Sequence, residues 1–357
     1  MKIIFICTRS ITFNTFLISQ VNFFKKKKIN VKVACSDIEK LKFSNRFNYR
    51  IDFPTKYIHF LNLYRYVKIF FQIQNLVKKN QSSIFYLHTP VAAYIFRFFT
   101  FFYNLKIIYF VHGFRFTSKT KLITAFFYKF IEKLLSFKTK IFLTINNEDY
   151  NYAKNNLFNK VPTYKINGVG LDLQKSKINK NHNNKINKII VIAAYKKSKG
   201  YLEILKVAEI LKKEKIKIDC YGYGDYSDYK SIKILKKLKN ISFYKFDTNL
   251  KKKIKKYHIL LHLSEREGLP VSVMECLSKG IPVICYKIRG NVDLIKNNWN
   301  GYFIKSYLEV PKLINKLNFK EKLLNKIQIN AIKSITKSFS KKQVNQKIYR
   351  IIKKNFK

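Results

Sequence analysis

Short apolar runs alternate with longer amphipathic segments along the whole chain, and this alternation constrains the fold more than any other feature. Apolar runs of this length are typical of buried parallel strands, and the intervening segments, such as 12–27 and 64–79, have the apolar spacing of surface helices. Alternating strands and helices form a parallel sheet with helices on both faces, so the pattern predicts a doubly wound α/β fold. In the first half, the candidate strands are 2–7, 31–35, 84–87, 107–111 and 141–145.

The length of the chain predicts two such domains, because 357 residues exceed the size of one ordinary domain. The polar stretch 176–185 is the best linker in the chain. We therefore expect one domain over 1–175 and a second over 186–337. The second half repeats the alternation, with candidate strands at 186–193, 216–221, 241–244, 257–263 and 282–286.

Three glutamates, Glu265, Glu267 and Glu275, lie within eleven positions of an otherwise basic chain. The protein has 20 acidic residues against 72 basic ones, so uniform scattering would place fewer than one acid in such a window. The local chemistry thus departs from the composition of the rest. This departure marks the segment as a candidate site.

A strand, a turn and a helix surround the pair formed by Glu267 and Glu275. The apolar run 257–263 precedes a turn at Gly268, and a helix is expected over 271–279. The first N–H groups of such a helix offer a site for a phosphate. Because carboxylates beside a phosphate repel it, we expect them to accept hydrogen bonds from hydroxyls of the same ligand. The pattern indicates a nucleotide-sugar site, with two solvated surface glutamates as the alternative.

Further motifs accompany this Glu-x7-Glu pair. In the second half, the motifs are Lys279-Gly-Ile-Pro-Val283 and Arg289-Gly-Asn-Val-Asp-Leu294. In the first half, they are Leu87-His-Thr-Pro90, Tyr109-Phe-Val-His-Gly-Phe-Arg-Phe116 and Asn167-Gly-Val-Gly-Leu-Asp172. The set resembles family 4 of the retaining glycosyltransferases, most of all bacterial members that extend sugars on polyprenyl-diphosphate carriers. The resemblance covers nearly the whole chain to about residue 304.

The resemblance implies the GT-B fold, in which two Rossmann-like domains face each other across a cleft. The first domain would bind the acceptor and the second the donor, and a final helix at about 338–357 would cross back to the first domain. The implied activity is transfer of a hexose or N-acetylhexosamine from a nucleotide-sugar, expected to be a UDP-sugar, to a hydroxyl of a lipid-linked or polysaccharide-precursor acceptor. The product would belong to a cell-surface glycan such as O-antigen or capsule.

Site residues follow from the same resemblance. Lys199 would neutralise the donor diphosphate, Glu275 would hold the ribose, and Glu267 would hold the transferred sugar. His112 would approach the reacting sugar from the first domain. The catalytic set is therefore His112, Glu267 and Lys199. The remaining expected donor contacts are Gly222, Gly224, Gly268, Leu269 and Pro270, and the expected acceptor contacts are Arg9, His88 and Phe114.

One departure from the family pattern affects the phosphate grip. The arginine usual five residues before Lys199 is replaced by Ala194. Lys196 or Lys197 would have to compensate. The other histidines, His59, His182, His258 and His262, belong to no recognisable constellation and are interpreted as surface or core residues.

The expected reaction retains the anomeric configuration and needs neither a cofactor nor a metal. No Asp-x-Asp sequence occurs in the chain, so lysine and the helix start would take the place of a divalent cation at the diphosphate. A glycosidase pair of acid and nucleophile is the less favoured alternative, because the two carboxylates lie at a phosphate-type turn.

The net charge of +52 favours an anionic partner, although the lysines are spread along the chain and part of the excess is compositional. Nucleic-acid binding would concentrate them in a stripe or an arm, so no nucleic acid is expected. The aromatic and basic stretches 95–103 and 122–135 are too short to span a bilayer but suit its interface. Their apolar faces would otherwise cover the first sheet.

We expect a cytoplasmic protein, peripheral at the inner membrane surface. Its five cysteines form no CxxC pair, and no signal peptide is recognisable. The competing hypothesis is a non-catalytic basic protein that binds membranes or nucleic acid on a degenerate transferase scaffold.

Overall fold

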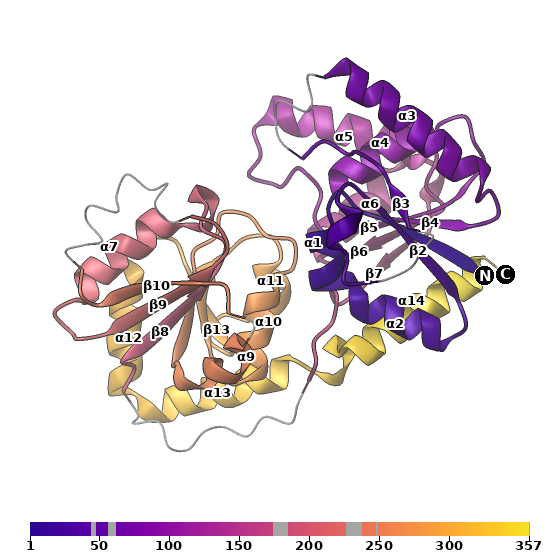
Figure 1. Cartoon of the computed structure of the whole chain (residues 1–357). Coiled ribbons are helices and arrows are strands. Elements are labelled where there is room, and N and C mark those ends of the chain that lie inside the picture. Colours follow the sequence, from indigo (N-terminus) through magenta and orange to yellow (C-terminus); the bar gives the residue numbers. More distant parts are fainter. Residues whose placement is uncertain (44–47, 56–61, 174–184, 226–237, 248, 357) are drawn as a thin grey trace. The chain divides into compact units, whose positions relative to one another are not determined.

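Two parallel sheets organise the chain, each in its own unit (Figure 1). The computed structural model describes residues 1–43, 48–55, 62–173, 185–225, 238–247 and 249–356. Unit 1 comprises Met1–Gly170 and Ser340–Lys357, and unit 2 comprises Leu171–Phe339. The sequence predicts a first domain over 1–175 and a second over 186–337. The linker expected at 176–185 lies outside the described residues except for Lys185.

The sheet of unit 1 has the order β3-β2-β1-β4-β5-β6-β7, and all its neighbouring strands are parallel. The chain starts in the middle, builds outward through β3, and then returns to the other side of β1. This reversal between β1 and β4 creates a crevice at the carboxyl ends of the two strands, where α/β proteins bind ligands. The strands are β1 (Lys2–Ile6), β2 (Asn30–Cys35), β3 (Tyr49–Arg50), β4 (Ile84–His88), β5 (Lys106–Val111), β6 (Ile141–Thr144) and β7 (Thr163–Lys165).

Helices cover both faces of this sheet. One face carries α3 (Leu63–Lys78), α4 (Pro90–Phe99), α5 (Leu122–Ser136) and α6 (Asn147–Asn156), whose buried residues share one apolar cluster with the strands. The opposite face carries α1 (Ser10–Thr12), the π-helical turn Phe13–Leu17, α2 (Ile18–Lys26) and the last helix, α14 (Lys341–Asn355). α14 packs on α2, with the rings of Phe23 and Tyr349 6.2 Å apart, and so belongs to unit 1. Short 3-10 turns lie at Ile38–Lys40 and Phe158–Lys160.

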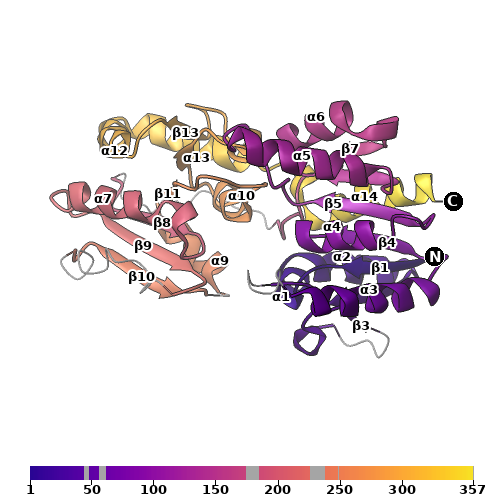
Figure 2. The same ribbon diagram turned by 90° about the horizontal axis from the view of Figure 1, so that it is seen from above.

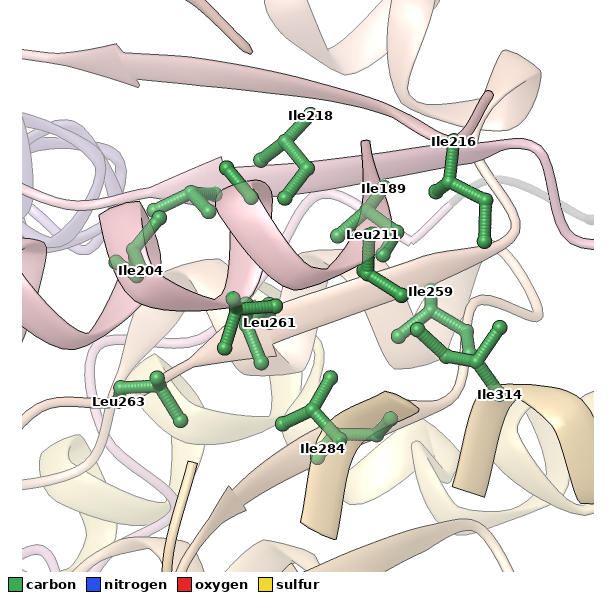
Figure 3. Close-up of a cluster of buried hydrophobic side chains, with 14 of the residues drawn as sticks. Ile189, Ile204, Leu211, Ile216, Ile218, Ile259, Leu261, Leu263, Ile284 and Ile314 are labelled. Carbon is green, nitrogen blue, oxygen red and sulfur yellow. The ribbon is translucent and has the colours of Figure 1, made fainter. Parts of the chain in front are cut away.

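Unit 2 repeats the design, with the strand order β10-β9-β8-β11-β12-β13 and the reversal between β8 and β11. Its core is almost entirely aliphatic, as Figure 3 shows for Ile189, Leu261 and Ile284. The strands are β8 (Lys188–Ile192), β9 (Lys217–Gly222), β10 (Ile241–Lys245), β11 (Ile259–His262), β12 (Val283–Tyr286) and β13 (Gly301–Ile304). The helices are α7 (Tyr201–Leu211), α9 (Leu250–Lys253), α10 (Val271–Ser278), α11 (Asn291–Leu294), α12 (Glu309–Phe319) and α13 (Glu321–Ser334), with 3-10 turns at Lys197–Lys199, Ile254–Lys256 and Lys337–Phe339.

The doubly wound parallel architecture confirms the fold class predicted from the alternation. Three strands were not predicted: β3, β7 and β13. Each lies at an edge of its sheet and has two to four residues, so its apolar pattern is too short to stand out. Among the described residues, no helix combines the length and the apolar character needed to cross a bilayer.

Candidate active site

Three loops meet at the carboxyl end of the unit 2 sheet, following the neighbouring strands β8, β11 and β12. The loop after β8 ends at Gly200, whose φ of +75° suits glycine. A Cβ on Gly200 would lie 2.2 Å from the carbonyl oxygen of Leu263, so a side chain there would push the two loops apart. The N–H of Glu265 donates to the carbonyl of Ser198 at 3.0 Å. Lys199 is thereby held against the loop that carries the glutamates.

Glu267 lies between two basic side chains. Its Oε1 is 2.6 Å from Lys199 Nζ and 3.4 Å from His262 Nε2. Burial alone would raise the pKa of Glu267, but His262 and Lys199 outweigh it and hold the pKa at about 2. The carboxylate is therefore ionised throughout the neutral range.

His262 was wrongly interpreted as a residue without a constellation. It is the last residue of β11 and is almost fully buried, directly beneath the Glu267 loop. The signal was its position at the carboxyl end of a predicted strand, where side chains of a parallel sheet reach the ligand edge. Of the other histidines in that group, His258 is buried, and His59 and His182 lie outside the described residues.

The loop after β12 fixes the backbone of the Glu267 segment. Arg289, only 6% exposed, donates from Nε to the carbonyl oxygen of Glu267 at 2.9 Å. Gly290 has a φ of +81°, and a Cβ there would lie 2.5 Å from the carbonyl oxygen of Gly268. This close approach explains why Arg289 is followed by a glycine in the motif Arg289-Gly-Asn-Val-Asp-Leu294.

The helix α10 starts at Val271, directly after buried Leu269 and Pro270. Pro270 has an extended conformation (ψ 117°) and precedes the helix, one position earlier than expected. The N–H of Met274 donates to the Pro270 carbonyl, so the earlier N–H groups of the helix have no acceptor within it. The start of α10 thus presents donors and a partial positive charge at the loop edge.

Glu275 lies farther along α10, beside a basic recess of about 470 Å³. Its Oε1 is 2.9 Å from Lys251 Nζ. Burial, reinforced by neighbouring lysines, lowers the pKa of Lys279 in this recess. The lining combines the carboxylates of Asp172 and Glu275 with several cations, as a site for a ligand with hydroxyls and phosphates requires. It consists of Leu171, Asp172, Asn249, Lys251, Lys252, Ile254, Lys255, Glu275, Ser278 and Lys279.

Gly222, the last residue of β9, and Gly224, two residues later, serve the packing of neighbouring strand ends. A Cβ on Gly222 would lie 2.0 Å from the carbonyl oxygen of Ala193. Gly224 has a φ of +102°. They allow the N–H of Tyr195 to donate to the carbonyl of Tyr223 at 2.7 Å. A structural reason for Gly222 and Gly224 is therefore sufficient, and the geometry adds no specific ligand contact.

In unit 1, His88 and His112 form a pair at the carboxyl ends of β4 and β5. His88 Nδ1 and His112 Nε2 are 3.1 Å apart. Burial lowers the pKa of His112 to about 4, and burial together with His112 lowers the pKa of His88 well below its usual range. Both imidazoles are therefore neutral at pH 7. His88 is fully buried and stacked on Phe5, so it lies behind His112 as a support, and its expected acceptor contact stays a prediction.

The remaining acceptor candidates differ in accessibility. Arg9 follows β1, and its side chain is 54% exposed. Its Nε lies 3.6 Å from Asp37 Oδ2. Phe114 is 1% exposed and stacks on Phe116, so it lies in the core of unit 1, and the expected acceptor contact stays a prediction. Lys196 and Lys197 are exposed, and no contact places either at Glu267. Within the described ranges, no group of three or more His, Cys, Asp or Glu side chains is arranged to hold a metal.

Comparison with known proteins gives two family models that together cover both units. The model described as "Glycosyl transferases group 1" matches residues 173–334, and the one described as "Glycosyl transferase 4-like" matches residues 2–146. The chain is similar to the putative glycosyltransferase EpsD of Bacillus subtilis, with 24% identity over 85% of this chain and 83% of that protein.

Two further similarities extend this result. A UDP-Gal:alpha-D-GlcNAc-diphosphoundecaprenol alpha-1,3-galactosyltransferase of Escherichia coli is 23% identical over 78% of this chain and 77% of its own length. The solved structure of Anabaena HepE in complex with UDP and glucose matches with a TM-score of 0.76 at 14% identity, over 99% of this chain and all of that one. The structural match establishes the GT-B fold.

Proposed function

Since the chain belongs to the family 4-type glycosyltransferases of the GT-B fold, we propose that it transfers a sugar from a UDP-sugar to a lipid-linked acceptor, with retention at the anomeric carbon. The observation that carries the proposal is the cluster of Lys199, Glu267 and His262 beside the start of α10. The cluster brings a cation, a carboxylate and the N–H groups of the first turn of α10 to the reversal of strand order in unit 2. In this architecture, ligands bind at that reversal.

Lys199 stabilises the departing diphosphate in this proposal. The leaving group gains negative charge as the glycosidic bond breaks, and a fixed cation beside it lowers the barrier. Lys199 Nζ is paired with Glu267 Oε1 at 2.6 Å. The pair keeps both side chains in place, and the incoming phosphate takes over the lysine while Glu267 accepts hydrogen bonds from sugar hydroxyls.

Arg289 supplies the positive charge that Ala194 lacks. Its guanidinium is held beside the Glu267 loop by the 2.9 Å bond from Nε. A guanidinium carries several further N–H donors in a fixed plane, which suits phosphate oxygens. The two-cation grip of the family is then formed by Lys199 and Arg289.

His112 serves the transferred sugar as a neutral hydrogen-bonding group. Its lowered pKa keeps it uncharged, so it can accept or donate a hydrogen bond without attracting the diphosphate. Glu275 holds the ribose beside the recess lined by Lys251. No protein nucleophile is assigned, because the departing phosphate can itself help to deprotonate the acceptor hydroxyl on the same face of the sugar.

The proposals of a lipid-linked acceptor and of a location at the membrane rest on similarity to known proteins and on net charge. The Escherichia coli relative is named for transfer to a diphosphoundecaprenol-linked sugar, and HepE was solved with UDP. The net charge of +52 suits an anionic membrane. We therefore place the protein in the cytoplasm at the inner membrane surface, in the synthesis of a cell-surface glycan such as O-antigen or capsule.

Donor turnover tests the proposal. The protein is incubated with UDP- and GDP-sugars and a polyprenyl-diphosphate-linked sugar, with and without EDTA, and the anomeric configuration of the product is determined. We expect turnover of a UDP-sugar with retention, undiminished by EDTA. Glu275→Gln should mainly raise KM for the donor, and Glu267→Gln should mainly lower kcat.

Three results would contradict individual parts of the proposal. An inverted product would exclude retention, and loss of activity in EDTA would exclude metal-independent transfer. If no donor is consumed and Glu275→Gln leaves UDP binding unchanged, the non-catalytic hypothesis of a degenerate scaffold is favoured instead.

A further inference from the structure

The outer surface of the α3, α4 and α5 layer in unit 1 is densely apolar. Figure 2 looks onto this layer and shows α4 between α3 and α5. The inner faces of these helices pack on the sheet, which is one of the two interpretations that the sequence left open for 95–103 and 122–135. Many large apolar residues nevertheless point outward: Leu63, Tyr64, Val67, Phe70, Phe71, Phe98, Phe102, Leu122, Ile123, Phe126, Phe127, Phe130, Leu134 and Phe137.

On α5 these residues form one continuous stripe. At about 100° per residue, the exposed positions from Leu122 to Phe137 fall within an arc of about 140°. Phe126 is 73% exposed, Phe127 59% and Phe130 57%. Such contiguous exposure of aromatic side chains is rare on a protein surface that faces only water. The stripe is therefore expected to bind a partner.

A buried ion pair orients this stripe. Arg97 of α4 and Glu132 of α5 are both fully buried, with Nη2 and Oε2 2.9 Å apart. The Arg97 guanidinium also lies 4.5 Å from the centre of the Tyr109 ring in β5. These contacts fix the rotation of α5 on the sheet, so the aromatic residues cannot turn inward without breaking the pair.

The segments that form this surface contribute exposed charges of one sign, and among their neighbours the Asp52 carboxylate pairs with Lys68 at 2.9 Å. In the segments 62–80, 90–103 and 115–140, the only acidic residue is Glu132, which is buried. Lys138 is half-buried, and the exposed cations of these segments are Lys68, Lys78, Lys79, Arg115, Lys119, Lys121, Lys129, Lys133 and Lys140. A second copy of the same face would bring like charges together. An anionic lipid surface accepts both the aromatic rings and the cations.

We infer that this surface, named here the α3–α5 face, is the part of the protein that docks on the membrane. The aromatic residues of α5 enter the interface between headgroups and acyl chains, and the flanking lysines contact anionic headgroups. This inference deepens the proposed membrane location and rests on it, but vesicle binding is measured without donor or acceptor. Membrane docking and sugar transfer can therefore fail separately.

Vesicle sedimentation tests the inference. The full chain is mixed with vesicles of phosphatidylcholine alone or with 30% phosphatidylglycerol, and bound protein is measured against lipid concentration. The test variant is Phe126→Ser/Phe127→Ser/Phe130→Ser. The matched control is Phe319→Ser, since Phe319 is 90% exposed but belongs to unit 2. We expect the triple variant to bind anionic vesicles at least about tenfold more weakly, and the control to bind like the parent.

Charge and folding are checked separately. Lys129→Gln/Lys133→Gln should weaken binding only to the anionic vesicles. All substituted side chains are exposed, so the thermal unfolding of each variant should match the parent. The inference is overturned if the triple variant binds vesicles like the parent, or if it instead abolishes self-association in sedimentation velocity, which would assign the face to a second copy.

Activity separates this inference from the proposed function. On a water-soluble acceptor with a truncated lipid, the triple variant should retain the turnover of the parent. An active parent that does not bind vesicles would refute the docking face and leave the transferase intact. Vesicle binding by an inactive parent would leave the docking face intact and refute the transferase.

Discussion

At the residue scale, the contact between Lys199 and Glu267 links two roles that the sequence assigned separately. The lysine was expected at the diphosphate and the glutamate at the sugar, and their side chains are 2.6 Å apart. A sugar carbon joined directly to its phosphate requires the two groups to be neighbours. The observed distance between the two side chains therefore agrees with their proposed roles on either side of the sugar–phosphate bond.

Removal of the Lys199 charge should slow the chemical step more than it weakens donor binding. We expect Lys199→Gln to lower kcat by about 10²–10³-fold, because the charge acts on the leaving group in the transition state. Steady-state kinetics with varied UDP-sugar measures the effect, and the exposed neighbour Lys197→Gln is the control. An equal loss in both variants would show that only general positive charge matters.

A second cation at position 194 should strengthen donor binding. Ala194 is partly exposed, so an arginine has room to extend into solvent. We expect Ala194→Arg to lower KM for the donor by about three- to tenfold, in the range of a hydrogen bond to a charged group. Because Arg289 is proposed to supply the second cation at the diphosphate, the gain in donor affinity from Ala194→Arg should be larger in an Arg289→Gln background. No gain in either background would show that the diphosphate lies elsewhere.

The pH dependence of stability follows from the lowered pKa values. His112 titrates at about 4 in the folded protein against an ordinary value of 6.5, so the unfolded chain binds protons first as the pH falls. Stability from this source is complete above pH 6.5 and is lost between pH 6.5 and 4. Glu267, with a pKa of about 2 against 4.5, adds a loss below pH 4.5.

Chemical denaturation at several pH values measures these losses. The free energy of unfolding should fall by roughly 1–3 kcal/mol between pH 7 and pH 4.5. His112→Gln should reduce the loss in that part of the profile, because only His88 then contributes a lowered histidine pKa there, and should leave the fall below pH 4.5. An unchanged profile in the variant would assign the first loss to other groups.

At the scale of secondary-structure elements, the Arg97–Glu132 pair joins α4 to α5. Burying two charges is costly, so the pair is better explained by orientation than by net stability. Glu132→Ala should lower the free energy of unfolding by about 3–5 kcal/mol, because Arg97 is left buried without its partner. The free energy of unfolding of the double variant Arg97→Met/Glu132→Leu should lie within about 1–2 kcal/mol of that of the parent. Denaturant titration of both variants distinguishes this account from one in which each side chain contributes independently.

At the scale of the whole molecule, the excess of basic residues should produce weak and strongly salt-dependent binding to polyanions. Binding to DNA depends only on charge here, so we expect its affinity to fall by at least about tenfold between 50 and 200 mM salt. Binding to anionic vesicles should fall less, because the aromatic residues of the α3–α5 face contribute independently of salt. Parallel salt titrations compare the two ligands, and equal slopes would refute the apolar contribution.

Local patterns were enough to predict the interior of both sheets and the turn and helix that carry Glu267 and Glu275. Strands such as β1 and β5 are long apolar runs, and the Glu267–Glu275 spacing depends only on a turn and one helix. The edge strands β3 and β13 were missed because their pairing is set by distant neighbours. His262 was missed for a related reason: its contact with Glu267 exists only once the loop after β11 folds back over the strand end.

The sequence by itself therefore determined the architecture, the family and the order of the site motifs, since these depend on periodicity and local spacing. Only the tertiary structure decided which side chains meet and which face outward. It buried Phe114 and His88, brought Arg289 to the Glu267 loop, and exposed Phe126 where the pattern also allowed a buried face. The physical reason is that the apolar stripe of a helix has no preferred neighbour until the sheet and a pair such as Arg97–Glu132 fix its rotation.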